Sequence, residues 1–190
     1  KKLNIQPILT FYHFSHPMWF ETKGAWTKKE NIIDFLKFIS KCLEVFGDLV
    51  EEYITINEPN VYAVNGHLFG IWPPANKSLK QTLDVMSVFA LAHIKAYELI
   101  HTIRESRRYT NTKVSFAHHV RDFTSKTNCL IDQTTTKVFK SLFQDKLTKA
   151  MFLGDFEFPL INYGKVKPGK YIDFIAVNYY TRSAISNFKE

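Results

Sequence analysis

The chain has 190 residues, of which 45% are hydrophobic and 15% aromatic, so it can bury the core of one domain and is not expected to be disordered as a whole. No run of about 18 uncharged apolar residues occurs, which argues against a membrane-spanning helix and a membrane partner. The 25 Lys and Arg residues outnumber the 18 Asp and Glu residues, but they are mostly dispersed, which favours solvated faces over a nucleic-acid-binding surface.

The first half of the chain alternates strand and helix patterns. Residues 8–12 form a β-rich run behind Pro7 and predict a strand. Apolar residues at i, i+3, i+4 and i+7 spacing predict an amphipathic helix over residues 31–46, ended by Gly47. Residues 50–56 predict the next strand, which runs into Asn57 and Glu58.

The second half continues the alternation. Ser78 with Gln81 is typical of a capping box and predicts the start of a second helix. That helix ends near Arg104, Arg107 and Arg108, where cations favour the helix dipole and water. A strand is predicted over 113–119, a weaker helix over about 130–151, and a last strand over 172–177.

This β-α-β-α-β-α-β order predicts an α/β fold with parallel strands and right-handed crossovers. Two architectures fit, a doubly wound sheet and part of a (β/α)8 barrel. The first strand is not followed by a glycine-rich phosphate loop, which weakens the doubly wound alternative. Polar residues follow all four strands, as expected where a barrel gathers its chemistry: His13, Asn57-Glu58, His118-His119 and Asn178-Tyr179-Tyr180.

Glu58 is the strongest candidate for chemistry. It follows the β-branched run Ile54-Thr55-Ile56, and Pro59 ends strand pairing beyond it. Burial at such a position disfavours the charged form of a carboxyl group, which suits a proton donor. An ordinary loop glutamate paired with a lysine fits the spacing equally well.

A family resemblance favours the first interpretation. Residues 54–59 resemble the T-x-N-E-P signature of glycoside hydrolase family 1, the β-glucosidase family. Further matches follow in the family's order along nearly the whole chain: Tyr12-His13-Phe14 with Pro17, Gly24-Ala25-Trp26, Phe46-Gly47-Asp48, Gly66 to Pro74, Ala92-His93, Gly154-Asp155-Phe156, Asp173-Phe174 and Asn178-Tyr179-Tyr180.

The resemblance implies a role for each matching residue. Glu58 corresponds to the general acid/base, and Asn57 to the residue that hydrogen-bonds the sugar 2-hydroxyl. His13 corresponds to a residue that binds sugar hydroxyls. Tyr180 corresponds to the tyrosine that hydrogen-bonds the nucleophile, and Asn178 is expected to line the same pocket.

The same resemblance implies strands three to six of a (β/α)8 barrel, with residues 1–190 forming one partial domain truncated at both ends. The implied reaction is retaining hydrolysis of terminal β-linked sugars from a small glycoside or oligosaccharide, without cofactor or metal. The family's nucleophile motif, E-N-G, does not occur in these residues, so we expect this chain alone to be inactive. A degenerate, non-catalytic carbohydrate-binding or interaction protein is the alternative.

The resemblance is incomplete within the matched segments. Phe14 and Asn60 stand where the family has tryptophan, Ser15-His16 replaces D-L, and Ala176 replaces glycine. These differences concern substrate preference more than membership. The two cysteines, Cys42 and Cys129, form no disulfide framework, which favours the reducing cytoplasm.

Overall fold

The computed structural model describes residue 3 and residues 5–186, and its centre is a parallel four-stranded sheet. The strands are β1 (Ile8–Tyr12), β2 (Glu52–Asn57), β3 (Lys113–Ser125) and β4 (Ala176–Ile185), and they lie side by side in chain order. A doubly wound sheet would reverse its order at a switch point, whereas sequential parallel order is that of a barrel wall. The prediction of parallel strands joined by helices is therefore confirmed.

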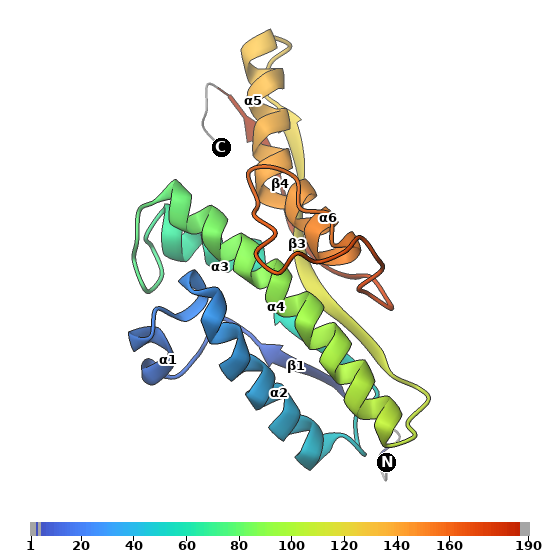
Figure 1. Cartoon of the computed structure of the whole chain (residues 1–190). Helices are drawn as coiled ribbons and strands as arrows, with labels where there is room; N and C mark the ends of the chain where they lie inside the picture. The colour runs from blue at the N-terminus through green and yellow to red at the C-terminus, as the bar shows by residue number, and fades with distance from the viewer. Residues whose placement is uncertain (1–2, 4, 187–190) are drawn as a thin grey trace.

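Helices cover one face of the sheet. They are α1 (Met18–Thr22), α2 (Ile32–Phe46), α3 (Pro59–Ala63), α4 (Leu79–Ser106), α5 (Leu130–Lys140) and α6 (Lys146–Leu153). Figure 1 shows α2 and α4 side by side across the sheet. Short 3-10 turns over Ala25–Thr27 and Lys29–Asn31 precede α2. A π-helical turn over Val64–Leu68 extends α3, and another over Ser141–Asp145 separates α5 from α6.

The two long helices follow from their sequences. In α2 the buried side chains recur at helical spacing, at Ile32, Phe35, Ile39 and Leu43. At the start of α4 the Ser78 hydroxyl accepts a hydrogen bond from the Gln81 backbone N–H, as the capping pattern predicts.

Where α2, α3 and α4 meet the start of the sheet, aromatic rings fill the core. Phe89 of α4 is fully buried and contacts Tyr12, Trp26 and Tyr62, with ring centroids 4.8–5.7 Å apart. This packing fixes β1 and α3 against α4, and with them the ends of β1 and β2.

The last two strands differ from their predicted bounds. β3 continues to Ser125 rather than ending at 119, and β4 occupies 176–185 rather than 172–177. The two pair from Ala117 and Ala176 to Ser125 and Ile185, so backbone hydrogen bonding between them extends both strands through polar sequence.

Residues 172–175 do not form a strand with β3, because the Asp173 side chain accepts the hydrogen bond that a strand carbonyl would otherwise accept. The Asp173 carboxylate accepts a hydrogen bond from the Val114 backbone N–H at 2.8 Å, and the Asp173 N–H donates to the Val114 carbonyl at 2.9 Å. This exchange fixes the approach to β4 and delays its first strand pair until Ala176.

The predicted helix over 130–151 is also interrupted. A π-helical turn divides it into α5 and α6.

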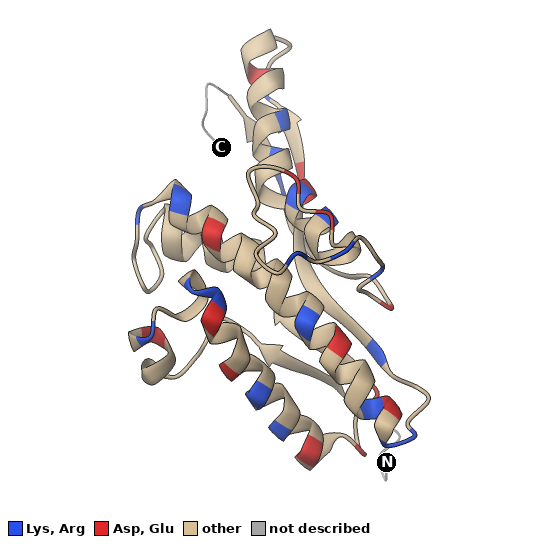
Figure 2. Ribbon diagram, in the orientation of Figure 1, with Lys and Arg blue, Asp and Glu red and all other residues tan. Residues whose placement is uncertain are grey.

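The charged surface is mixed in sign, and Figure 2 shows both acidic and basic residues along α2 and α4. Arg104 departs from the expected solvated arginine group, because it is buried with its guanidinium 4.0 Å from the Tyr109 ring centroid. Among the described residues, no helix is long and apolar enough to cross a membrane.

Candidate functional site

Glu58 lies at the junction of β2 and α3, and its backbone is held on both sides. Its N–H donates to the Ala117 carbonyl of β3 at 2.7 Å, and its carbonyl accepts from Val61 and Tyr62 in α3. Its φ of 44° and ψ of 59° are left-handed, a conformation that costs a residue with a side chain about 1–3 kcal/mol. The surrounding hydrogen bonds hold this turn, which directs the side chain from the strand end toward β4.

The Glu58 carboxylate is the centre of a hydrogen-bonded cluster. Glu58 is only 5% exposed, and its Oε1 accepts hydrogen bonds from Asn178 Nδ2 and from the Tyr180 hydroxyl, each at 2.8 Å. Asn178 Nδ2 also donates to Asn57 Oδ1 at 3.1 Å. The Glu58 hydrogen bond raises the pKa of the Tyr180 phenol, which keeps that hydroxyl protonated as a donor.

Four of the five predicted site residues therefore meet, although β2 and β4 are far apart in sequence. Glu58 and Asn57 come from the end of β2, and Asn178 and Tyr180 from the start of β4. Tyr180 is 66% exposed, so the cluster opens on the side where its ring lies. The amide of Asn57 and the carboxyl group of Glu58 are buried, whereas the phenol of Tyr180 is exposed, so the cluster forms a polar edge at the ends of β2 and β4.

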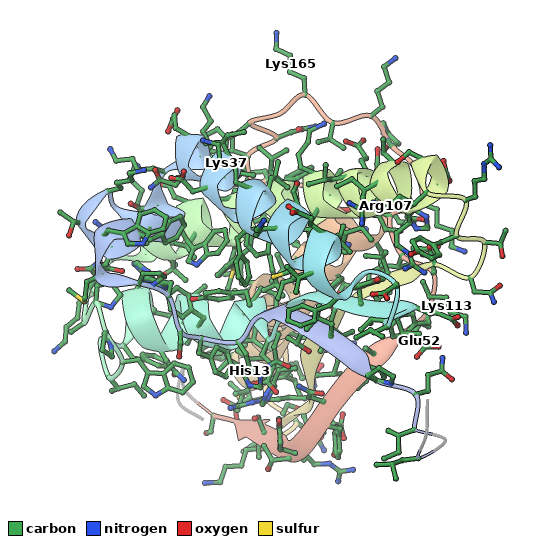
Figure 3. All side chains as sticks on the ribbon, turned by 90° about the horizontal axis from the view of Figure 1, so that it is seen from below. His13, Lys37, Glu52, Arg107, Lys113 and Lys165 are labelled. Carbon is green, nitrogen blue, oxygen red and sulfur yellow. The ribbon has the colours of Figure 1, made fainter. Side chains whose placement is uncertain are left out.

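His13 follows β1 and is not part of this cluster. Figure 3 shows it on the strand side of the molecule, whereas Lys37 and Lys165 project from the helical side. Its ring makes an edge contact with Phe14, whose ring in turn contacts Trp72. In the described part of the chain, no hydrogen bond joins His13 to Glu58, Asn57, Asn178 or Tyr180.

Two other histidines are buried and serve packing. The imidazole of His93 in α4 lies 2.7 Å from the Thr55 hydroxyl and 2.8 Å from the Tyr171 carbonyl, and burial lowers its pKa to about 4. Burial likewise lowers the pKa of His118 to about 4, beside the ring of Phe116. Both imidazoles are neutral near pH 7.

Two residues beyond the five predicted site residues also lie beside the Glu58 carboxylate. His119 Nδ1 lies 3.7 Å from Glu58 Oε1, and the His119 carbonyl accepts a hydrogen bond from Asn60 Nδ2 at 2.8 Å. Asn60, one of the departures from the family pattern, thus ties α3 to β3 beside Glu58. Because successive side chains of a strand point to opposite faces, only one of the adjacent residues His118 and His119 can face Glu58, and that residue is His119.

Within the same described part of the chain, no group of three or more His, Cys, Asp or Glu side chains is arranged to hold a metal ion.

The sequence profile of glycosyl hydrolase family 1 matches residues 1–190. The chain belongs to this family. It is 26% identical to a 6-phospho-beta-galactosidase of Clostridium acetobutylicum over 197 residues, covering 95% of this chain and 41% of that protein. A putative beta-glucosidase of Arabidopsis thaliana is also 26% identical, with 97% and 41% covered.

Solved structures of this family show the same arrangement. The beta-glycosidase from Pyrococcus horikoshii superposes with a TM-score of 0.83 at 30% identity, covering 96% of this chain and 41% of that one. The four parallel strands and their helices form part of the (β/α)8 barrel of this family 1 fold. The chain spans about two fifths of the length of the relatives it matches.

Proposed function

We propose that this family 1 chain supplies the acid/base side of a retaining β-glycosidase site, with Glu58 as the general acid/base. The observation that carries the proposal is the buried Glu58 carboxyl group at a strand end, hydrogen-bonded by Asn178. In the first step Glu58 protonates the leaving glycosidic oxygen. In the second it takes a proton from the water that attacks the glycosyl intermediate.

The other cluster members have distinct roles in this proposal. Asn57 holds the sugar 2-hydroxyl, a contact that strengthens as the transition state gains oxocarbenium character. Asn178 orients the Glu58 carboxylate. His13, exposed after β1, binds sugar hydroxyls at a greater distance from the proton transfer.

A retaining site also needs a nucleophilic carboxylate about 5–5.5 Å from the acid/base. The groups that contact the Glu58 carboxylate in the described part of the chain are an amide, a phenol and an imidazole. We propose that residues 1–190 form one partial barrel domain and that this chain alone does not turn over glycosides. The Tyr180 hydroxyl, which here donates to Glu58, would turn to the nucleophile in a complete site.

The relatives' names suggest the substrates to test: terminal β-glucosides, after the Arabidopsis relative, and 6-phospho-β-galactosides, after the Clostridium relative. A degenerate carbohydrate-binding protein is the competing proposal, and the orientation of Tyr180 toward Glu58 is the observation that favours it.

The deciding experiment uses the longest protein that the gene encodes around these residues. Its hydrolysis of p-nitrophenyl β-glucoside, β-galactoside and 6-phospho-β-galactoside is compared with that of Glu58→Gln. We expect kcat to fall about 10²–10⁴-fold in the variant, and azide to restore part of kcat, because azide attacks the glycosyl intermediate without a general base. Sugar binding without hydrolysis would favour the competing proposal, and unchanged hydrolysis in Glu58→Gln would exclude Glu58 as the acid/base.

A further inference from the structure

The structure decides which of the adjacent histidines of β3 faces Glu58. Successive side chains of a strand point to opposite faces. His118 packs beside Phe116, with ring centroids 5.5 Å apart. His119 lies on the other face, its ring 5.0 Å from that of Tyr180 and its Nδ1 atom 3.7 Å from Glu58 Oε1. The His119 and Glu58 side chains are each only 7% exposed, so this contact lies largely out of water.

A neighbouring arginine determines which nitrogen of His119 carries the proton. Arg121 Nε lies 3.0 Å from His119 Nε2. A guanidinium can only donate, so His119 Nε2 must accept. A neutral imidazole with an accepting Nε2 carries its proton on Nδ1, the nitrogen that faces Glu58.

Arg121 is itself fixed in place. Its guanidinium lies over the Phe143 ring, 5.3 Å from the centroid, and its backbone N–H donates to Gln144 Oε1 at 3.1 Å. The hydrogen bond to His119 therefore comes from a side chain that its surroundings orient.

We propose that His119, held in the Nδ1–H form by Arg121, is a positioning residue for Glu58. Asn178 Nδ2 then donates a hydrogen bond to Glu58 Oε1 at 2.8 Å, and the Nδ1–H of His119 faces the same oxygen at 3.7 Å, as a favourable electrostatic contact. A proton on Oε1 would point at groups that themselves donate protons, which is unfavourable. The proton that Glu58 exchanges with a glycoside is therefore carried on the other carboxyl oxygen, Oε2. The inference rests on the proposed acid/base function of Glu58, but the hydrogen placement can be tested without substrate.

The first measurement is a proton–nitrogen correlation spectrum of the 190-residue chain labelled with ¹⁵N-histidine, recorded above pH 7. The His119 signals are assigned from their loss in His119→Gln. We expect the nitrogen shift of a protonated Nδ1 and of an unprotonated Nε2. A proton on Nε2 in the unaltered chain would overturn the proposal.

Two substitutions of Arg121 form a matched pair. Arg121→Gln keeps an N–H donor on the same carbon that bears Nε, whereas Arg121→Met keeps an unbranched side chain and removes the donor. We expect Arg121→Gln to retain the Nδ1–H form and Arg121→Met to lose it in favour of the Nε2–H form that free imidazole side chains prefer in water. Equal spectra for the two variants would contradict the role of Arg121.

If Arg121→Met does not fold, the spectra of the unaltered chain and of Arg121→Gln still decide the question. Because the spectra need no turnover, this test and the hydrolysis test fail independently. If the His119 proton is found on Nε2, the proposed acid/base role of Glu58 is unaffected. If the full-length protein does not hydrolyse glycosides, the proposed position of the His119 proton is unaffected.

Discussion

Asp173 offers the most direct test of how the site is assembled, because it fixes the approach to the strand that carries Asn178 and Tyr180. Its carboxylate accepts three hydrogen bonds: from the Tyr97 hydroxyl at 2.9 Å, from His101 Nε2 at 2.8 Å and from the Val114 backbone N–H at 2.8 Å. One side chain thus joins α4, β3 and the segment before β4. The hydrogen bond to Asp173 also contributes to raising the pKa of the Tyr97 phenol, after burial as the larger cause, so the phenol remains a donor.

The expected cost of Asp173→Ala follows from these partners. Hydrogen bonds to a charged group contribute about 1.5–3 kcal/mol each when buried. The Asp173 side chain is 22% exposed, and water can replace the partners of Tyr97 and His101. Val114 is fully buried, so its N–H would lose its partner without replacement. We therefore expect Asp173→Ala to lower the free energy of unfolding by about 3 kcal/mol.

Urea unfolding followed by circular dichroism measures this cost. Asp173→Asn keeps one carbonyl acceptor and should lose about 1 kcal/mol, because the amide oxygen can still serve the Val114 N–H. Asp48→Ala, at an exposed position after α2, is the matched control and should change stability by less than about 0.5 kcal/mol. A cost for Asp173→Ala no greater than that of the control would refute the reasoning.

Two further predictions concern the core. Phe89→Ala should lower the free energy of unfolding by about 3–5 kcal/mol, because it opens a cavity among Tyr12, Trp26 and Tyr62. Phe89→Leu leaves a smaller cavity and should cost less. Equal urea midpoints for the two variants would contradict this. The low pKa values of His93 and His118 predict that stability falls as the pH drops from about 6.5 to about 4, since the unfolded chain binds protons there that the folded chain does not. The loss should be about 1.4 kcal/mol per pH unit per histidine in urea titrations, and His93→Gln should reduce the slope.

The sequence singled out two of the candidate site residues through local signals, which lie within a few neighbouring positions. Asn57 and Glu58 follow a β-branched strand and precede a proline, and this pattern needs no distant contact. The helices α2 and α4 are equally local, because helical spacing and a capping serine specify them. Family motifs added Asn178 and Tyr180 as candidates. The resemblance paired Tyr180 with the nucleophile, whereas in the structure its hydroxyl donates to Glu58.

The positions that sequence reasoning misassigned depend on distant partners. The burial of Arg104 comes from stacking on Tyr53 and Tyr109, which its own helix does not contain. The bounds of β4 come from pairing with β3, and the start of that pairing is set by Asp173 and Val114. A polar strand gains its order from backbone hydrogen bonds to its neighbour, so its own composition carries little signal.

The amino-acid sequence by itself determined the alternation of strands and helices, the family, and a glutamate placed where a buried strand ends. Only the tertiary structure decided that His119 rather than His118 faces this glutamate and that His13 lies apart from its cluster. The physical reason is separation along the chain: Asn178 and Tyr180 lie more than a hundred residues from Glu58. Strand pairing and the packing of α4 bring these side chains within hydrogen-bonding distance.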